Sequence, residues 1–354
     1  MFLEFLYSLA YYKEYKYKMK SKIYITGASG FIGFHASKKL LDKGIKVHGF
    51  DSMNNYYDIG LKKARLNILK KYKNFSFTRG LLENQKLLNN SVIKFKPAII
   101  IHLAAQAGVR YSIDNPDTYL NSNIVGTFNV IKIADKVKVK HLIIGSSSSV
   151  YGANKKIPFR EIDKTDHQVS FYAATKKSTE SLAHSYSSLW KLPITMLRFF
   201  TVYGPLGRPD MAYFKFTKKI LEGKKIDIYN KGKMYRDYTY IDDIIDGIYK
   251  LLNKIPSLNN KKKFKNDSLS PVAPFRILNI GNTQKIYLLD FINTLEKELN
   301  KKAIKNLMPM QKGDVQSTLS DTNLLKRITN YNPSTSYKLG VKRFIKWYKD
   351  YYKQ

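Results

Sequence analysis

Hydrophobic residues along the chain form short, nearly continuous runs, separated by longer segments with helical spacing. A helix is predicted from Ile32 to Lys43, where Gly44 ends it, between the first two apolar runs. Apolar strands that alternate with helices are typical of a parallel sheet covered on both faces. The sequence therefore predicts an α/β fold with a doubly wound parallel sheet, whose strands lie at residues 22–26, 46–51, 75–78, 98–103, 141–145 and 194–200.

The pattern changes after Phe200. Pro205, Gly207 and Pro209 lie close together, the predicted elements become shorter, and residues 253–274 form a polar stretch that reads as an exposed loop. We expect a smaller α/β domain there, which binds substrate and returns some of its segments to the main sheet. The predicted boundaries are 21–200 for the main, cofactor-binding domain and 201–354 for the smaller domain.

Residues 1–20 differ from the rest of the chain and are predicted to be an N-terminal extension. Their apolar part is too short to span a bilayer, and it lacks the basic start and the small-residue cleavage site of a secretory signal. We therefore expect no membrane insertion. The chain has no cysteine, which excludes disulfides and cysteine nucleophiles and fits a reducing cytoplasm.

The formal net charge is +35, from 62 Lys and Arg against 27 Asp and Glu. Because the lysines are scattered along the whole chain, they predict a solvated surface rather than a nucleic-acid site, although their field would attract an anionic substrate. The six histidines show no ligand spacing with carboxylates, so no metal site is predicted.

A glycine-rich segment, TGASGFIG at residues 26–33, lies between the first predicted strand and the first helix. Glycines there permit a tight turn and let backbone amides approach a pyrophosphate at the helix N-terminus, as in Rossmann-type folds. Asp51 ends the second strand and is placed to accept the ribose hydroxyls, which favours NAD over NADP. Asn54 and Asn55 add no positive charge nearby. The predicted NAD contacts in this region are Gly27, Gly30, Phe31, Ile32, Gly33, Asp51 and Asn55.

Tyr172 and Lys176 are four residues apart, so on a helix they lie on one face. Lowering a tyrosine pKa from about 10 to near 7 requires about 4 kcal/mol. The Lys176 cation and the positive ring of an oxidised nicotinamide would supply it, which would make Tyr172 a base. A tyrosine and a lysine at this spacing also occur by chance, but here a serine run at residues 146–149 precedes them at the end of an apolar strand.

Together these segments resemble the extended short-chain dehydrogenase/reductase family and, within it, the NAD-dependent nucleotide-sugar epimerases. The similarity runs from about Lys22 to Tyr352 and is closest to UDP-glucuronate 4-epimerases, whose product usually serves surface polysaccharides. The segments that carry it are TGASGFIGFHASKKLL, HLAAQAGVRYS, SSSSVYGAN, SFYAATKKSTE, LRFFTVYGPLGRPDMA, KMYRDYTYIDDI, LNIGN and PMQKGDV.

The resemblance implies that Tyr172 takes the proton from the sugar 4-hydroxyl while the hydride at that carbon passes to NAD. Lys176 would lower the tyrosine pKa and hold the nicotinamide ribose, and Ser147 would hydrogen-bond the same sugar oxygen. The 4-keto sugar then turns over and recovers the hydride on its other face. The cofactor would also be lined by Leu103, Ala104 and Ala105.

The resemblance also separates related activities. Sugar-nucleotide dehydratases carry acidic residues just before the V-Y-G, and decarboxylases that make UDP-xylose carry a glutamate at the second of these positions. This chain has Ser148 and Ser149, which cannot transfer protons at neutral pH in that way. Three alternatives stay open: an epimerase for another UDP-hexose or an N-acetylated UDP-sugar, to which Thr318 is relevant; a UDP-glucuronate decarboxylase; and an inactive NAD-binding scaffold for RNA.

A glucuronate oxidised at C4 is a β-keto acid, which readily loses carbon dioxide. An epimerase for uronates must therefore hold the carboxylate near the plane of the carbonyl group. The candidates are Thr201 and Arg208, with help from Ser148. An arginine suits a carboxylate because its guanidinium makes two parallel hydrogen bonds.

At the UDP end, the resemblance implies that Arg236 contacts phosphate, Asp314 the uridine ribose and Tyr229 the uracil, with Arg110 near the sugar. Leu81 stands where the family usually has an aspartate that contacts the adenine amino group. The absence of that one hydrogen bond should weaken NAD binding by about 1 kcal/mol. Family members usually form homodimers, here through helices at about residues 118–136 and 172–190.

Overall fold

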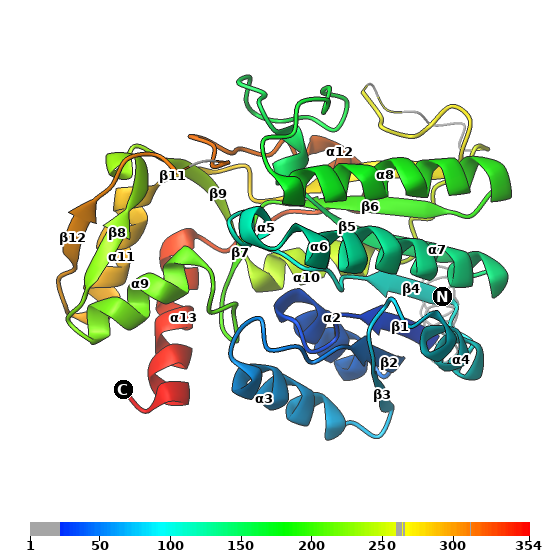
Figure 1. Cartoon of the computed structure of the whole chain (residues 1–354), viewed down its shortest axis with the longest axis horizontal. Helices are drawn as coiled ribbons and strands as arrows, with labels where there is room; N and C mark the ends of the chain where they lie inside the picture. The colour runs from blue at the N-terminus through cyan, green and yellow to red at the C-terminus, as the bar shows by residue number, and fades with distance from the viewer. Residues whose placement is uncertain (1–21, 260–263, 265, 312) are drawn as a thin grey trace, which may run out of the picture.

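The computed structural model describes residues 22–259, 264, 266–311 and 313–354, so the predicted extension at 1–20 lies outside the described residues. Its main feature is a seven-stranded sheet in which every pairing is parallel (Figure 1). In spatial order the strands are β10 (Phe275–Ile280), β6 (Ile194–Phe199), β5 (His141–Ser147), β4 (Ile99–His102), β1 (Lys22–Thr26), β2 (Lys46–Asp51) and β3 (Phe75–Arg79). This confirms the predicted Rossmann-type doubly wound fold.

Helices cover both faces of this sheet, because successive strand residues point to opposite sides. In β1, for example, Ile23 and Ile25 belong to one core and Tyr24 to the other. The first core packs against α2 (Phe31–Asp42), α3 (Ile59–Lys70), α10 (Ile241–Leu251) and α12 (Asn323–Thr329); the second packs against α4 (Gln85–Phe95), α7 (Gly126–Lys136) and α8 (Phe171–Trp190).

The residues after 200 build a second layer beside the sheet (Figure 1). It contains a three-stranded sheet of β7 (Thr201–Tyr203), β9 (Tyr235–Tyr240) and β11 (Lys285–Tyr287), and a two-stranded sheet of β8 (Lys225–Ile228) and β12 (Ile304–Leu307). Helices α9 (Ala212–Leu221), α11 (Leu288–Leu299) and α13 (Tyr337–Tyr352) pack on them. Strand β10 and helix α10 return to the main sheet, and the division at residue 200 stays a prediction.

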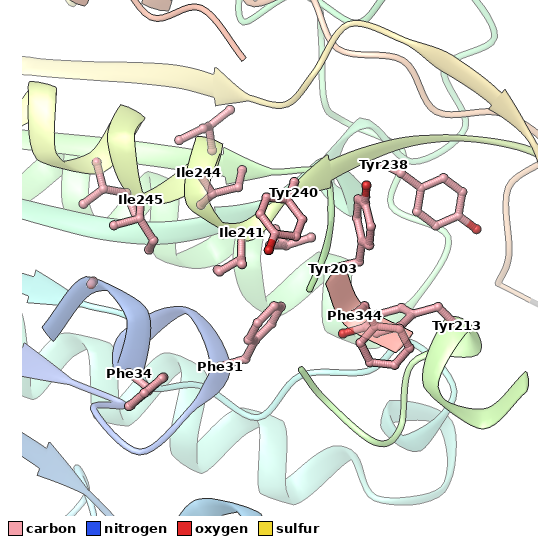
Figure 2. Close-up of a cluster of buried hydrophobic side chains, with 14 of the residues drawn as sticks. Phe31, Phe34, Tyr203, Tyr213, Tyr238, Tyr240, Ile241, Ile244, Ile245 and Phe344 are labelled. Atoms are coloured by element: carbon pink, nitrogen blue, oxygen red, sulfur yellow. The ribbon is translucent and has the colours of Figure 1, made fainter. Parts of the chain in front are cut away.

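A shared hydrophobic core joins the two parts of the chain. Figure 2 shows Phe31 of α2 facing Ile241 at the start of α10, and Tyr203 and Tyr240 beside them. The Tyr203 ring packs edge-on against Tyr240 at 5.8 Å between ring centroids. This core is continuous across the two parts of the chain. Within the described residues, no helix is long and apolar enough to cross a membrane.

Candidate active site

The carboxyl ends of the parallel strands open into a cavity of about 1340 Å³ that both parts of the chain line. In open α/β sheets this is where ligands bind, beyond the carboxyl ends of the strands. All the site residues predicted from the sequence lie in its wall except Asn55. Asn55 is exposed, and Asn54 stands in the wall instead, because the chain turns at Met53, which has a positive φ of 54°.

The turn at residues 27–33, called the glycine turn below, needs glycine wherever its backbone passes close to other backbone atoms. Gly27 has a φ of +75°, and a Cβ there would lie 2.7 Å from the amide nitrogen of Ala104. A Cβ on Gly33 would lie 2.0 Å from the Gly27 carbonyl oxygen. Gly30 is the N-cap of α2, and the first residues of this helix line the cavity, so the turn fits a pyrophosphate at a helix N-terminus.

Asp51 is held at the end of β2 by two backbone amides: Oδ2 accepts from Ser29 at 3.0 Å and Oδ1 from Met53 at 2.8 Å. Sequence reasoning missed a cation nearby. Lys62 of α3 is 5% exposed, donates to the Asn54 carbonyl at 2.7 Å, and burial lowers its pKa. A lysine eleven residues after Asp51 gives no signal in the sequence, because only the turn into α3 brings it to the cavity.

The segment after β4 forms the next part of the wall. Thr26 Oγ1 accepts from the amides of Leu103 and Ala104, both at 3.2 Å, and bonds His102 Nδ1 at 2.7 Å. These bonds hold the segment Leu103 to Ala105 against the glycine turn. Leu81, beyond β3, also lines the cavity with a hydrophobic side chain that is 56% exposed.

Tyr172 and Lys176 lie on the first turns of α8, as predicted. Ser170 caps this helix by accepting from the Ala173 amide at 3.1 Å, and Ser112 Oγ accepts from the Tyr172 amide at 3.2 Å. Burial raises the pKa of the Tyr172 phenol, whereas a hydrogen bond with Ser147 acts to lower it. The tyrosine is therefore oriented by its own backbone and by a serine from β5.

Lys176 is buried and donates from Nζ to the Gly145 carbonyl at 2.7 Å. Burial lowers its pKa to about 8, and the Glu180 carboxylate opposes this effect. The sequence predicted that Lys176 itself would favour the tyrosinate. In the structure the Lys176 ammonium is held at Gly145, and the charge of Arg208 also acts to lower the Tyr172 pKa. The effect expected of Lys176 stays a prediction.

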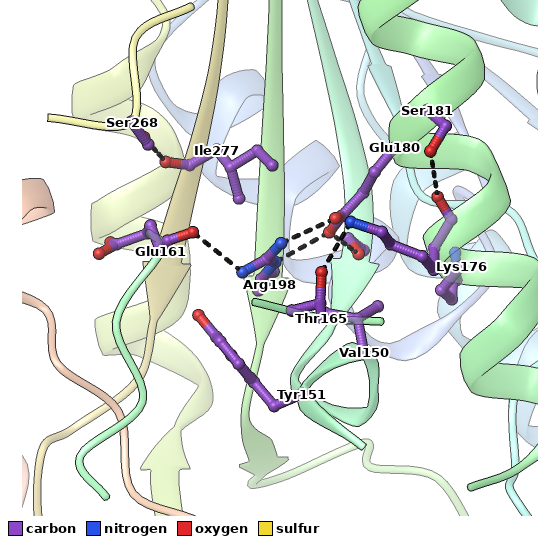
Figure 3. A network of polar contacts seen from close by, with 12 residues as sticks. Val150, Tyr151, Glu161, Thr165, Lys176, Glu180, Ser181, Arg198, Ser268 and Ile277 are labelled. Carbon is purple, nitrogen blue, oxygen red and sulfur yellow. Dashed lines mark hydrogen bonds and ion pairs between the residues drawn. The ribbon is translucent and has the colours of Figure 1, made fainter. Parts of the chain in front are cut away.

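A buried polar network lies beneath these residues (Figure 3). Arg198 of β6 donates to Glu180 of α8 through Nε at 2.9 Å and Nη2 at 2.8 Å, and both side chains are 2% exposed. Glu180 also accepts from Ser146 at 2.7 Å, and the Arg198 guanidinium lies 4.8 Å from the Tyr151 ring. Glu180 was not singled out from the sequence. It follows Lys176 by one helical turn, and this spacing could have indicated that the two side chains lie on the same face of α8.

The serines after β5 form a short 3-10 helix, η2 (Ser148–Tyr151), that faces the cavity. Ser147 donates to Ser149 Oγ at 3.1 Å and accepts from the Ser149 amide at the same distance. Arg208, which lines the same cavity, donates from Nε to Asp210 at 3.0 Å. Burial alone would raise the pKa of Asp210, but the charge of Arg208 and its hydrogen bond bring it below its ordinary value. Asp210 was also missed.

The four residues predicted for the UDP end lie together: two arginines approach Asp314, and Tyr229 packs against one of them. Arg236 Nη2 lies 2.8 Å from Asp314 Oδ1, and Arg110 Nη2 lies 3.9 Å from Asp314 Oδ2. The Arg110 guanidinium stands 4.5 Å from the centre of the Tyr229 ring. Thr318 lies in the same wall, and its buried Oγ1 has no hydrogen-bond partner among the described residues. Two arginines and an aromatic ring form a surface suited to a nucleoside diphosphate.

The cavity combines a glycine turn at a helix N-terminus with an acidic residue after the second strand. It also holds a serine, a tyrosine and a lysine together. This combination defines an enzyme with a nicotinamide dinucleotide cofactor. The family model described as "NAD dependent epimerase/dehydratase family" matches residues 23–265. The chain belongs to this family, and NAD is its cofactor, as the sequence predicted.

Several relatives are similar over nearly the whole chain. A probable UDP-glucuronate 4-epimerase of Rhizobium meliloti is 48% identical over 93% of this chain and 97% of its own length. UDP-glucuronate 4-epimerase 4 of Arabidopsis thaliana is 44% identical over 93% of this chain and 76% of its own. The crystal structure of UDP-glucuronic acid 4-epimerase from Bacillus cereus, in complex with UDP-glucuronic acid and NAD, is 33% identical, covers 94% of this chain and 100% of its own, and has a TM-score of 0.83.

Proposed function

We propose that this protein catalyses the NAD-dependent 4-epimerisation of UDP-glucuronate to UDP-galacturonate through a transient 4-keto intermediate. The observation that carries the proposal is that Ser147, Tyr172 and Lys176 share one cavity with the glycine turn and with the Arg236 and Asp314 pair. The relatives and the solved structure named above support the same reaction and substrate.

NAD supplies the hydride acceptor and donor for C4 of the sugar when it is bound in the cavity. Tyr172 takes the proton of the 4-hydroxyl as the carbonyl forms and returns it when the hydride comes back. Ser147, which already hydrogen-bonds the tyrosine, holds the same sugar oxygen. Lys176 is fixed at Gly145, where its ammonium would hold the nicotinamide ribose.

The uronate carboxylate distinguishes this substrate from neutral hexoses. Ser148, Thr201 and Arg208 all line the cavity, and we infer that they hold the carboxylate near the plane of the C4 carbonyl. In that orientation the bond to the carboxyl carbon is not aligned with the carbonyl π system, so carbon dioxide is retained. The hydroxyls of Ser148 and Ser149 cannot act as the acid and base that a dehydratase needs near neutral pH.

The first experiment is to incubate the purified chain with UDP-glucuronate, with and without added NAD, and to follow the products by proton NMR. We expect UDP-galacturonate, with no net NADH and no carbon dioxide. A requirement for added NAD would support the effect proposed for Leu81. If UDP-glucuronate is returned unchanged in both samples, the uronate assignment to Thr201 and Arg208 is wrong, and other UDP-sugars, then RNA, become the next candidates to test.

We further propose a homodimer through α7 and α8, and a cytoplasmic location. Phe128 on α7 and Leu189 and Trp190 on α8 are 37%, 69% and 48% exposed, and the two helices pack side by side (Figure 1). Burying such side chains against a second copy removes apolar surface from water. Sedimentation velocity should show a dimer for the native chain and a shift to monomer for Phe128→Glu, but not for Ile304→Glu on β12. A monomeric native chain would refute the proposal.

A further inference from the structure

The loop that carries Arg208 is held by α2 and α3, two helices that cover the seven-stranded sheet. Its bounds are residues 204–211, between β7 and α9. On α3, Arg65 donates to the Leu206 carbonyl through Nε at 3.0 Å and through Nη2 at 2.7 Å, and to the Gly207 carbonyl at 2.8 Å. On α2, His35 Nε2 lies 3.0 Å from the Pro205 carbonyl. The three carbonyls that directly precede Arg208 are therefore each bound from outside the loop.

The same guanidinium also contacts the glycine turn. Arg65 Nη1 donates to the Ser29 carbonyl at 3.0 Å and to the Tyr57 hydroxyl at 2.8 Å. Ser29 lies within the turn at residues 27–33 that fits the pyrophosphate. Arg65 thus connects, through one rigid planar group, the place where the cofactor is held and the loop that presents Arg208 to the substrate.

The bonding of Arg65 is complete. A guanidinium has five N–H donors, and the five hydrogen bonds to Leu206, Gly207, Ser29 and Tyr57 use them all. The side chain is 0% exposed. A fully buried polar group is tolerated when every donor is satisfied, and the fixed fork of an arginine sets the positions of its acceptors in a way that a lysine cannot reproduce.

We propose that Arg65 is a positioning residue that sets the distance between the cofactor and Arg208, and so keeps the substrate carboxylate from being lost as carbon dioxide. The proposal rests on the proposed function. Ser147, Tyr172 and Lys176 come from β5 and α8, which Arg65 does not contact through any of its five bonds. A change at Arg65 therefore moves Arg208 relative to the cofactor turn while leaving Ser147, Tyr172 and Lys176 in place.

The chemical consequence is specific. When the carboxylate rotates out of the carbonyl plane, the bond between C5 and the carboxyl carbon breaks, and its electron pair enters the C4 carbonyl to give an enolate. Carbon dioxide leaves, water supplies a proton to C5, and the hydride returns to C4. The product is a UDP-pentose, and NAD is regenerated, so the step needs no additional oxidant or reductant.

The test compares Arg65→Lys and Arg65→Met with the native chain. The substrate is UDP-glucuronate labelled with ¹³C at C6. Released carbon dioxide, UDP-galacturonate and bound NAD are measured in the same samples. Arg276→Lys is the matched control, because Arg276 is a buried arginine on β10 that pairs with Asp267 at 3.0 Å and lies outside the cavity wall. We expect the ratio of carbon dioxide to epimer to rise about tenfold or more in both Arg65 variants, since a displacement of about 1 Å can cost about 10²-fold in rate. The control should keep the native ratio.

The outcomes separate the two proposals. If the native chain does not epimerise UDP-glucuronate, the proposed function fails. If it does, and the folded Arg65 variants keep the native product ratio with only a lower Tm, Arg65 is merely structural and the inference is wrong. If neither variant folds, His35→Ala loosens the same loop at Pro205 without touching the glycine turn, and an unchanged ratio in that variant overturns the inference.

Discussion

Replacing Tyr172 with phenylalanine should lower kcat for the epimerisation about 10³-fold, because a positioned acid or base contributes about 10²- to 10⁴-fold to a proton-transfer step. The substitution removes only the hydroxyl. The amide of residue 172 still donates to Ser112, and the ring still packs edge-on against Tyr119 at 6.0 Å between centroids. The fold and the NAD content should therefore remain native.

The measurement is single-turnover conversion of UDP-glucuronate, together with bound NAD after denaturation. Tyr186→Phe is the matched control, since Tyr186 lies on the same helix but outside the cavity wall. It should retain native kcat. A Tyr172→Phe chain within tenfold of the native rate would show that another group moves the proton, and the assignment of Tyr172 would be withdrawn.

Replacing Arg208 with methionine should redirect turnovers from UDP-galacturonate to carbon dioxide and a UDP-pentose, and should raise KM for UDP-glucuronate about 10- to 100-fold. A hydrogen bond to a charged group contributes about 1.5–3 kcal/mol, which corresponds to that range. Arg208 donates to Asp210, and Tyr56 donates to the same carboxylate at 3.3 Å. Removing the arginine leaves Asp210 without its positive partner in the cavity, where its charge repels the substrate carboxylate.

The double variant Arg208→Met with Asp210→Asn separates these two effects. If repulsion by Asp210 causes the rise in KM, the double variant recovers much of the affinity while the release of carbon dioxide persists. The products are quantified by proton NMR and by trapping labelled carbon dioxide. An Arg208→Met chain that produces only UDP-galacturonate would show that Ser148 and Thr201 retain the carboxylate unaided.

Much of the fold and the cofactor site could be predicted from local patterns. The strands follow from apolar runs: β1 and β2 have the predicted bounds, and the other four predicted strands lie within two residues at either end. The glycine turn is local as well, because its close approaches, such as Gly33 to the Gly27 carbonyl, lie within one turn of chain. The spacing of Tyr172 and Lys176 needs only the geometry of one helix.

Two of the polar contacts that sequence reasoning missed join separate elements of the fold. Arg65 meets Leu206 across 141 positions, and Arg198 meets Glu180 only because β6 lies beside α8. A buried arginine on a lysine-rich helix looks like one more surface charge in the sequence. The role of Arg65 depends on which backbone carbonyls the fold brings within reach of its guanidinium.

The sequence by itself determined the parallel sheet, the cofactor turn and the placement of Tyr172 and Lys176 on one helix face, because each depends on periodicity or on neighbours within a few positions. Only the tertiary structure decided that the Lys176 ammonium rests on the Gly145 carbonyl and that Arg65 links the cofactor turn to the loop at residues 204–211. The physical reason is that charge and hydrogen-bond partners are chosen by distance in space, and a buried group must satisfy every donor with whatever the packed chain brings within reach.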